Sequence, residues 1–280
     1  MDTIDTLTRR TFLASTAVLP IALAATPGRS IPIGLELYSV RDELAKDLPG
    51  TIRAVAKMGY QVVEFYAPYM QWTTAYAKEV RSILDDAGIR CNSTHNGLDS
   101  FSAAKMPHAI ELNQIIGSHY VVLASPGTLK TLDEYKRVGE TLSGAMATLK
   151  AAGLGAGYHN HDAEWRPIEG RRPIEVIAAN TPQALMLQLD VGTCVEAGSD
   201  PVAWVRANPG RIRSLHLKDW SPERGYKVVF GEGRVPWAQL LDAAESVGGV
   251  EYYLIEQEES GDPMETVREC LANYRKVRPA

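Results

Sequence analysis

The sequence predicts an α/β fold, a single (β/α)8 TIM barrel preceded by a cleavable signal peptide. Two observations predict the barrel. Eight short apolar runs alternate with segments of helical period across residues 32–278, and no linker divides them. Strands that are buried on both faces read as continuous apolar runs and form parallel sheets. Eight such units in about 250 residues close into a barrel more readily than they form an open sheet.

The signal peptide is predicted at residues 1–25. Arg9 and Arg10 precede the apolar run LASTAVLPIALAA, which ends in small residues. A charged region, an apolar region and a small-residue cleavage site, in this order, are typical of an export signal, and the paired arginines indicate the twin-arginine route. The apolar run is shorter than the about 20 residues that a membrane span needs. We expect a periplasmic protein, cut near Ala24 or Ala25 and not membrane-bound after cleavage.

The predicted strands lie, in chain order, in IGLELYSV, QVVEFYA, IRCNSTHN, HYVVLASPG, LGAGYHNH, ALMLQLDVG, IRSLHLKDW and VEYYLIEQE. Between them, apolar residues recur at helical spacing, as from Tyr135 to Leu149 and from Met264 to Tyr274. Asp200-Pro201 and Asp262-Pro263 predict capped helix starts. Glycines mark predicted helix ends at Gly59, Gly88, Gly117, Gly153 and Gly248.

Composition excludes several classes of protein. The 280 residues are 45% hydrophobic and 22% charged, which supports a large core and argues against disorder. The net charge of −5 argues against a nucleic-acid partner, because such proteins usually present a basic face. Three cysteines without a C-x-x-C spacing do not form a disulfide framework, and we interpret them as small buried hydrophobes: Cys91, Cys194 and Cys270.

Polar residues gather where the predicted strands end, which is the functional face of such a barrel. Side chains alternate along a strand, so His159 and His161 are expected to face one way, as are Glu256 and Glu258. Carboxylates and imidazoles buried together are costly unless they are paired or coordinated, and a divalent cation is the simplest partner. Mixed nitrogen and oxygen ligands suit Mn²⁺, Co²⁺, Zn²⁺ or Mg²⁺. The residues at strand ends are Glu36, Glu64, His95, His159, His161, Asp190, His216, Lys218, Glu256 and Glu258.

The segment FGEGRVPW follows the seventh predicted strand and allows two interpretations. Gly231 and Gly233 permit close backbone approach, so that Glu232 reaches the site. Alternatively, the segment is a tight loop before a helix that starts at Pro236.

Four segments, QLDVGTCVEAGSDPVAWV, SLHLKDW, FGEGRVPW and YYLIEQE, resemble the sugar phosphate isomerase/epimerase superfamily of xylose isomerase-like TIM barrels. The resemblance covers residues 32–278 and implies one divalent metal ion, with one ligand from each of strands five to eight. Carried over to this sequence, the ligands are His159, Asp190, His216 and Glu256. The epimerase pattern has a Glu where His159 stands, so His161 and Glu164 remain alternatives as the strand-five ligand or proton carrier.

The resemblance implies an isomerase or epimerase that removes a proton next to the metal-bound carbonyl of a sugar or keto sugar. Glu256, His161 and Lys218 would be catalytic, and Glu36, Glu64, His95, Glu232 and Glu258 would bind the substrate. Because a metal-bound imidazole carries protons poorly, the departure at His159 also favours a lyase or dehydratase acting on 3-keto sugars or keto-glycosides.

Two further readings are weaker, and one property of relatives stays open. A periplasmic sugar-binding barrel without catalysis would keep the fold and lose the chemistry. A DNA-repair endonuclease would need a histidine where Thr193 stands, in a D-x-x-H pattern that starts at Asp190. The resemblance also allows a homo-oligomer.

Overall fold

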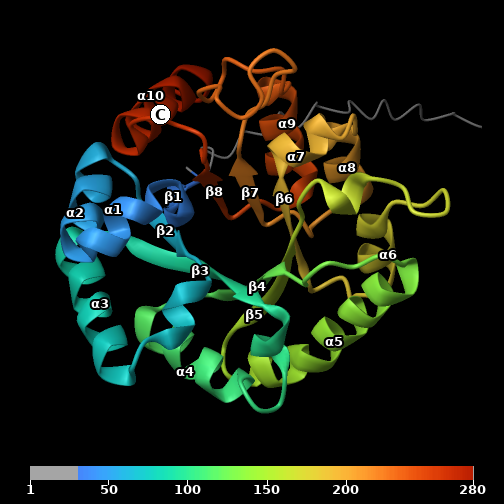
Figure 1. Ribbon diagram of the computed structural model, residues 1–280, viewed down its shortest axis with the longest axis horizontal. Helices are drawn as coiled ribbons and strands as arrows, with labels where there is room; N and C mark the ends of the chain where they lie inside the picture. The colour runs from blue at the N-terminus through green and yellow to red at the C-terminus, as the bar shows by residue number, and fades with distance from the viewer. Residues whose placement is uncertain (1–30, 280) are drawn as a thin grey trace, which may run out of the picture. The chain divides into compact units, whose positions relative to one another are not determined.

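The computed structural model describes residues 31–279, and it confirms the barrel. Eight parallel strands pair in chain order, and the last pairs with the first to close the sheet. The helices form a ring around the strands (Figure 1). The predicted signal peptide, residues 1–25, lies outside the described part of the chain.

The strands are β1 (Ile33–Glu36), β2 (Val62–Phe65), β3 (Arg90–Gly97), β4 (Tyr120–Ser125), β5 (Gly155–His159), β6 (Met186–Asp190), β7 (Ser214–Leu217) and β8 (Tyr252–Ile255). The helices are α1 (Arg41–Lys46), α2 (Leu48–Met58), α3 (Thr74–Ala87), α4 (Met106–Ile116), α5 (Leu132–Ala151), α6 (Pro173–Ala179), α7 (Val191–Glu196), α8 (Pro201–Ala207), α9 (Trp237–Ala243) and α10 (Pro263–Val277). Within residues 31–279, no helix is long and apolar enough to cross a membrane.

Most predicted helix boundaries are confirmed. Asp200 and Asp262 cap α8 and α10 through their side chains, and Gly59, Gly88 and Gly117 end helices in the left-handed conformation. These are the positions where a side-chain oxygen satisfies free N–H groups, or where the absence of a Cβ permits a positive φ.

Two boundaries show details that the sequence pattern does not specify. The last helical turn before β8 is a π-type turn, Ala244–Gly248, which takes up one more residue than an α turn. The left-handed position therefore falls on Gly249, with φ of 80°, and not on Gly248. The first strand ends at Glu36, because Leu37–Val40 forms a 3-10 turn in which the Glu36 carboxylate accepts from the backbone N–H of Tyr38.

Two apolar layers position the site. One lies between the strands and the surrounding helices and includes all three cysteines, which are buried and form no disulfide among the described residues. The other fills the inside of the barrel, where a Cβ on Gly34 would lie 2.4 Å from the side chain of Val62. This inner plug consists of Val62, Tyr120, Val122, Met186, Tyr252 and Leu254.

Candidate functional site

The polar residues of the site lie directly beyond the inner plug. Side chains of a strand return to the same face every second residue. Two residues after plug positions Val62 and Leu254 come Glu64 and Glu256, and Gln188 follows Met186 in the same way. The same two-residue step places Glu36 after Gly34 and His159 after Gly157. The alternation that closes one end of the barrel with apolar side chains thus lines the other end with polar ones.

His216 lies between two carboxylates. Its Nδ1 is 2.7 Å from Glu256 Oε2, and its Nε2 is 2.7 Å from Glu64 Oε1. Burial disfavours the charged imidazole, but Glu256 and Glu64 outweigh it and hold the pKa of His216 well above its ordinary value. We interpret the arrangement as a protonated imidazole between two ionised carboxylates.

Glu64 and Glu256 are ionised although both are buried. Burial raises the pKa of a carboxyl group, but His95 and His216 hold the pKa of Glu64 well below its usual range. For Glu256, Lys218 and His216 have the same effect and lower the pKa against the effect of burial. Glu256 therefore retains its capacity to accept a proton.

Glu36 behaves differently, although sequence reasoning grouped it with Glu64. Burial and the nearby charge of Glu64 raise the pKa of Glu36 well above its usual value. Its Oε1 is 4.0 Å from His95 Nδ1, and its Oε2 has no hydrogen-bond partner among the described residues. We interpret Glu36 as a protonated carboxyl group beside an ionised one.

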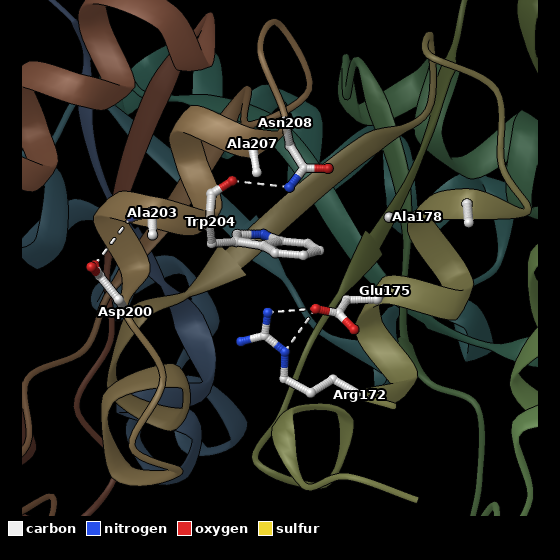
Figure 2. A pocket seen from close by; sticks show the side chains of 9 residues that line it. Arg172, Glu175, Ala178, Asp200, Ala203, Trp204, Ala207 and Asn208 are labelled. Atoms are coloured by element: carbon white, nitrogen blue, oxygen red, sulfur yellow. Dashed lines mark hydrogen bonds and ion pairs between the residues drawn. The ribbon is translucent and has the colours of Figure 1, made fainter. Parts of the chain in front are cut away.

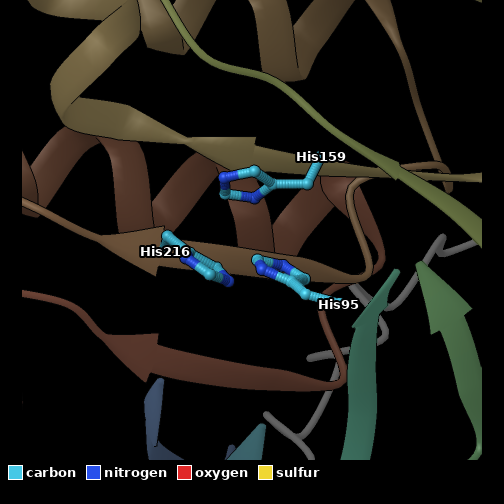
Figure 3. Close-up of side chains that lie close together, drawn as sticks. All are labelled: His95, His159 and His216. Atoms are coloured by element: carbon cyan, nitrogen blue, oxygen red, sulfur yellow. The ribbon is translucent and has the colours of Figure 1, made fainter. Parts of the chain in front are cut away.

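Three histidines from β3, β5 and β7 meet at this point, as Figure 3 shows. The ring centroid of His159 lies 4.4 Å from that of His216 and 4.5 Å from that of His95. Burial, followed by repulsion from His216 and His95, holds the pKa of His159 well below its ordinary value. His159 is therefore a neutral imidazole, the form that binds metal ions.

A side chain that sequence analysis did not single out connects this cluster. Gln188 Oε1 lies 2.8 Å from His95 Nε2 and 3.1 Å from His159 Nδ1. Its Nε2 donates to Glu64 Oε2 at 2.9 Å and to Ser214 Oγ at 3.3 Å. The signal was present in the segment QLD, since Gln188 lies two residues before Asp190 and so shares its face of β6.

The residues fit a divalent cation. His159, Asp190 and Glu256 each offer one ligand atom, and these atoms lie within 4.8 Å of one another. Asp190 Oδ2 is buried and has no hydrogen-bond partner in the described chain, although its Oδ1 accepts from the backbone N–H of Thr193 at 3.1 Å. An unsatisfied buried carboxylate oxygen beside a neutral imidazole is what a site for a cation such as Mn²⁺, Co²⁺, Zn²⁺ or Mg²⁺ provides.

The fourth predicted ligand, His216, stands apart from these three. Its ring nitrogens both face carboxylates, and the structure groups it instead with His95 and His159 as possible ligands. A further possible group, Glu36 with Glu64 and His95, lies on the β1–β3 side. Asn160, next to His159, donates to the backbone carbonyl of Asp190 at the end of β6 at 3.3 Å and to Thr193 Oγ1 in α7 at 3.1 Å.

Lys218 and Glu258 lie at the rim of the same site. The Lys218 ammonium forms an ion pair with Glu258 and lies 3.6 Å from Glu256 Oε1 and 3.7 Å from Asp190 Oδ2. Burial disfavours the charged amine, yet Glu256, Asp190 and Glu258 hold the pKa of Lys218 well above its usual value. Burial and the charge of Glu256 raise the pKa of Glu258 to about 7.

The raised pKa of Glu258 makes stability depend on pH. Below about 4.5, the value of the unfolded chain, both states hold the proton; between about 4.5 and 7 only the folded state does. Stability from this group is therefore lost as pH rises through that window. In Glu258→Gln the group cannot titrate, so this loss is absent. The unfolding free energy of the variant minus that of the wild type should therefore increase from pH 4.5 to 7. Urea unfolding of chelator-treated protein measures this difference, and a difference that stays constant with pH would contradict it.

Two predicted proton carriers, His161 and Glu164, lie beyond the end of β5. β5 ends at His159, and His161 is exposed, with its ring edge against His159 at a centroid distance of 4.9 Å. Glu164 accepts from the backbone N–H of His161 and from Tyr158 OH, both at 2.8 Å. Glu164 thus holds the turn after β5, and the expectation that strand alternation continues to His161 is wrong.

The loop after β7 is held by Asp219 and does not bring Glu232 among the buried polar residues. Glu232 is exposed and pairs with Arg224. The carboxylate of Asp219 accepts hydrogen bonds from five donors at 2.8–3.4 Å, namely the backbone N–H groups of Trp220, Gly231, Gly233 and Val235 and the indole N–H of Trp237. A Cβ on Gly233 would lie 2.0 Å from Asp219, so the loop requires glycine there.

A separate hollow lies elsewhere on the molecule. A depression of about 500 Å³ on the outer side of the barrel lies between α6 and α8, and Figure 2 shows Trp204 at its centre. Its polar residues are engaged with one another: Arg172 pairs with Glu175, and Asp200 caps α8. None of the buried titratable residues described above lines it, so the candidate site is the barrel mouth.

Comparison with known families agrees with this fold. The family described as xylose isomerase-like TIM barrel matches residues 52–277. No curated protein matches the chain. A sugar phosphate isomerase/epimerase of known structure from Parabacteroides distasonis ATCC 8503 is 26% identical, with a TM-score of 0.74 over 96% of this chain and 99% of that one.

Two more distant structures share the fold. A D-psicose 3-epimerase crystallised in the presence of D-fructose is 16% identical, with a TM-score of 0.67 over 89% of this chain and 100% of its own. A xylose isomerase-like TIM barrel protein from Mycobacterium smegmatis in complex with magnesium is 14% identical, with a TM-score of 0.70 over 89% of this chain and 96% of its own.

Proposed function

The chain belongs to the xylose isomerase-like TIM barrel family, and on that premise we propose that it is a divalent-metal-dependent isomerase or epimerase of a sugar or keto sugar. One observation carries the proposal: an ionised, buried Glu256 lies beside the possible ligand atoms of His159 and Asp190 and beside the Lys218 ammonium. A base, a cation site and a fixed positive charge at one point are what removal of a proton next to a carbonyl requires.

His159, Asp190 and Glu256 would hold the metal ion. The family pattern adds His216 as a fourth ligand, and His216 would have to lose one of its two ring protons before it could bind. When bound, the ion would polarise the carbonyl of the sugar, and any of Mn²⁺, Co²⁺, Zn²⁺ or Mg²⁺ suits this donor set.

Glu256 is the proposed base. Its carboxylate takes the proton from the carbon next to the carbonyl, and the electron pair of that C–H bond moves toward the carbonyl oxygen. Lys218 donates a hydrogen bond to the substrate oxygen where negative charge develops. Return of the proton by Glu256 to the former carbonyl carbon, with transfer of the α-hydroxyl proton to the former carbonyl oxygen, gives an isomer. Return by His161 to the opposite face of the same carbon gives an epimer.

A lyase or dehydratase is the second candidate, and a specific observation favours it. The position of the first ligand glutamate is held by His159, whose low pKa makes it a neutral ligand, so Glu256 faces no second carboxylate base there. Elimination requires one base and one acid. Glu256 would take the α-proton, the electron pair would form a C=C bond, and the β-oxygen would leave with the proton of Glu258, whose pKa is about 7.

One experiment separates these reactions. The protein is loaded with Mn²⁺, Co²⁺, Zn²⁺ or Mg²⁺ and incubated with free ketoses and 3-keto glycosides in deuterated buffer. Deuterium at the α-carbon of an isomer or epimer supports the first proposal, and release of water or an alcohol from the β-carbon supports the second. Sugar binding without exchange or elimination under all four metals would contradict both and leave a sugar-binding barrel.

We also propose that the protein is exported to the periplasm by the twin-arginine route. The support is the sequence Arg9-Arg10 before a short apolar run. A folded fluorescent reporter fused to residues 1–30 should reach the periplasm, and the Arg9→Lys, Arg10→Lys double variant should remain in the cytoplasm. A reporter that stays in the cytoplasm with both arginines present would refute the proposal.

A further inference from the structure

The orientation of the Gln188 amide is fixed by its neighbours. Gln188 is buried on β6, and one end of its amide lies 2.9 Å from Glu64 Oε2. Oε1 of the same carboxylate already faces the Nε2 atoms of His216 at 2.7 Å and His95 at 3.0 Å. An ionised carboxylate accepts hydrogen bonds and cannot donate them, so the amide end that faces it is the NH₂ group. The carbonyl oxygen of Gln188 consequently points the other way.

That carbonyl determines which nitrogen of His159 carries the proton. Gln188 Oε1 lies 3.1 Å from His159 Nδ1, and a carbonyl oxygen can only accept, so Nδ1 is the donor. A neutral imidazole has one proton, which leaves Nε2 with a free lone pair. His159 and Gln188 are paired residues of neighbouring strands, so the backbone register keeps the two side chains adjacent.

We propose that Gln188 is a positioning residue that holds His159 in the Nδ1–H tautomer, which leaves its Nε2 bare to bind a cation together with Asp190 and Glu256. The inference rests on the proposed function, because it assigns the metal-binding nitrogen of that site. Metal-bound histidines in proteins are commonly oriented by a hydrogen bond from their other ring nitrogen, and loss of that partner lowers metal affinity by about 10- to 100-fold. Here the partner is a neutral amide on β6, and the carboxylate of Glu64 on β2, the opposite strand of the barrel, holds it in place.

Three substitutions test the role of the amide. Gln188→Met keeps the approximate shape without the amide, and Gln188→Asn keeps the amide but shortens its reach. Both should release His159 into a mixture of tautomers. Gln188→Glu keeps an acceptor near Nδ1 and should keep the Nδ1–H form. If Gln188 only filled space, the Glu variant should disturb His159 more than the Met variant does, because it buries a new carboxylate next to Glu64. Ser214→Ala, which removes one of the two acceptors of the Gln188 NH₂ group, is the matched control and should keep the wild-type tautomer.

The tautomer is read by long-range proton–nitrogen correlation NMR on the metal-free full chain, which distinguishes a protonated ring nitrogen from a bare one. A bare Nε2 on His159 in the wild type, lost in the Met and Asn variants and kept in the Glu variant, is the expected result. A protonated Nε2 in the wild type, or an unchanged His159 in both the Met and Asn variants, would overturn the proposal. If the Met variant does not fold, the Asn variant decides by the same criterion.

Titration with Mn²⁺ measures the consequence for the cation site. Affinity should fall by about 10- to 100-fold in the Met and Asn variants relative to the wild type, and by less in Ser214→Ala. Equal affinity in all of them would overturn the link between the tautomer and the metal. A wild type that binds no divalent ion would refute the proposed function, whereas the NMR result on metal-free protein would still decide whether Gln188 sets the tautomer.

Discussion

A Glu256→Gln variant should lose turnover by about 10²- to 10⁴-fold, the usual contribution of a positioned base, while remaining folded. Glutamine keeps an oxygen that can accept from His216 and nearly the same volume, but it cannot take a proton from carbon. Lys218 and His216 keep Glu256 ionised by holding its pKa low, and an amide has no charge for them to stabilise. Because the same carboxylate is a proposed metal ligand, metal content must be measured alongside the rate.

The measurement is exchange of the α-proton with solvent deuterium, with unfolding by urea as the test of the fold. Glu251→Gln is the matched control, since Glu251 lies immediately before β8, on the same segment of chain as Glu256 but at the opposite end of the barrel. Glu251 contacts Tyr120 OH at 2.7 Å and is half-exposed near Arg213. The Glu251→Gln variant should exchange the substrate α-proton with solvent at the wild-type rate. A Glu256→Gln variant with wild-type exchange and full metal content would remove Glu256 from the mechanism.

Replacing Asp190 should have the second large effect, and the structure allows its two roles to be separated. Asp190 Oδ1 caps α7 by accepting from the N–H of Thr193, whereas Oδ2 is buried without a hydrogen-bond partner among the described residues. Asp190→Asn keeps a capping oxygen and removes the charge. Asp190→Ala removes both and should cost about 1 kcal/mol of stability for the cap in addition.

We therefore expect both variants to lose metal affinity by at least about 100-fold, more than the loss of an orienting partner, while only the Ala variant loses the cap. Calorimetric titration with Mn²⁺ and urea unfolding without metal measure the two effects separately. Burial raises the pKa of Asp190 despite the charge of Lys218, so the metal-free Asn variant should be no less stable than the wild type at neutral pH. Wild-type metal affinity in Asp190→Asn would exclude this residue as a ligand.

The barrel could be predicted because each of its parts leaves a local pattern. Apolar runs bounded by glycines and Asp-Pro caps fix the alternation of strands and helices without knowledge of distant contacts. Alternation within a strand also predicted that Asp190 and Glu256 would reach one site, and their possible ligand atoms lie together with that of His159. What failed did so at strand ends: β5 stops at His159, so the expected shared face with His161 does not exist.

The role of Gln188 could not be predicted, for a different physical reason. Its meaning depends on which side chains of β2, β3, β5 and β7 surround it, and this follows from the register of the closed sheet, not from any neighbouring residue. The shift from Gly248 to Gly249 is similar in kind, since a single π-type turn displaces a helix end without altering the composition of the segment.

The carboxylate of Asp219 has a consequence for how quickly a small molecule can be captured. With its five donors in place, the segment from Trp220 to Trp237 is tied at several points before anything binds. Because this segment is already ordered, ligand binding costs little conformational entropy there, since few backbone torsions remain to be fixed. Uptake at this side of the mouth should then follow simple one-step kinetics, with a rate proportional to ligand concentration and without the saturation that a slow closing segment would impose.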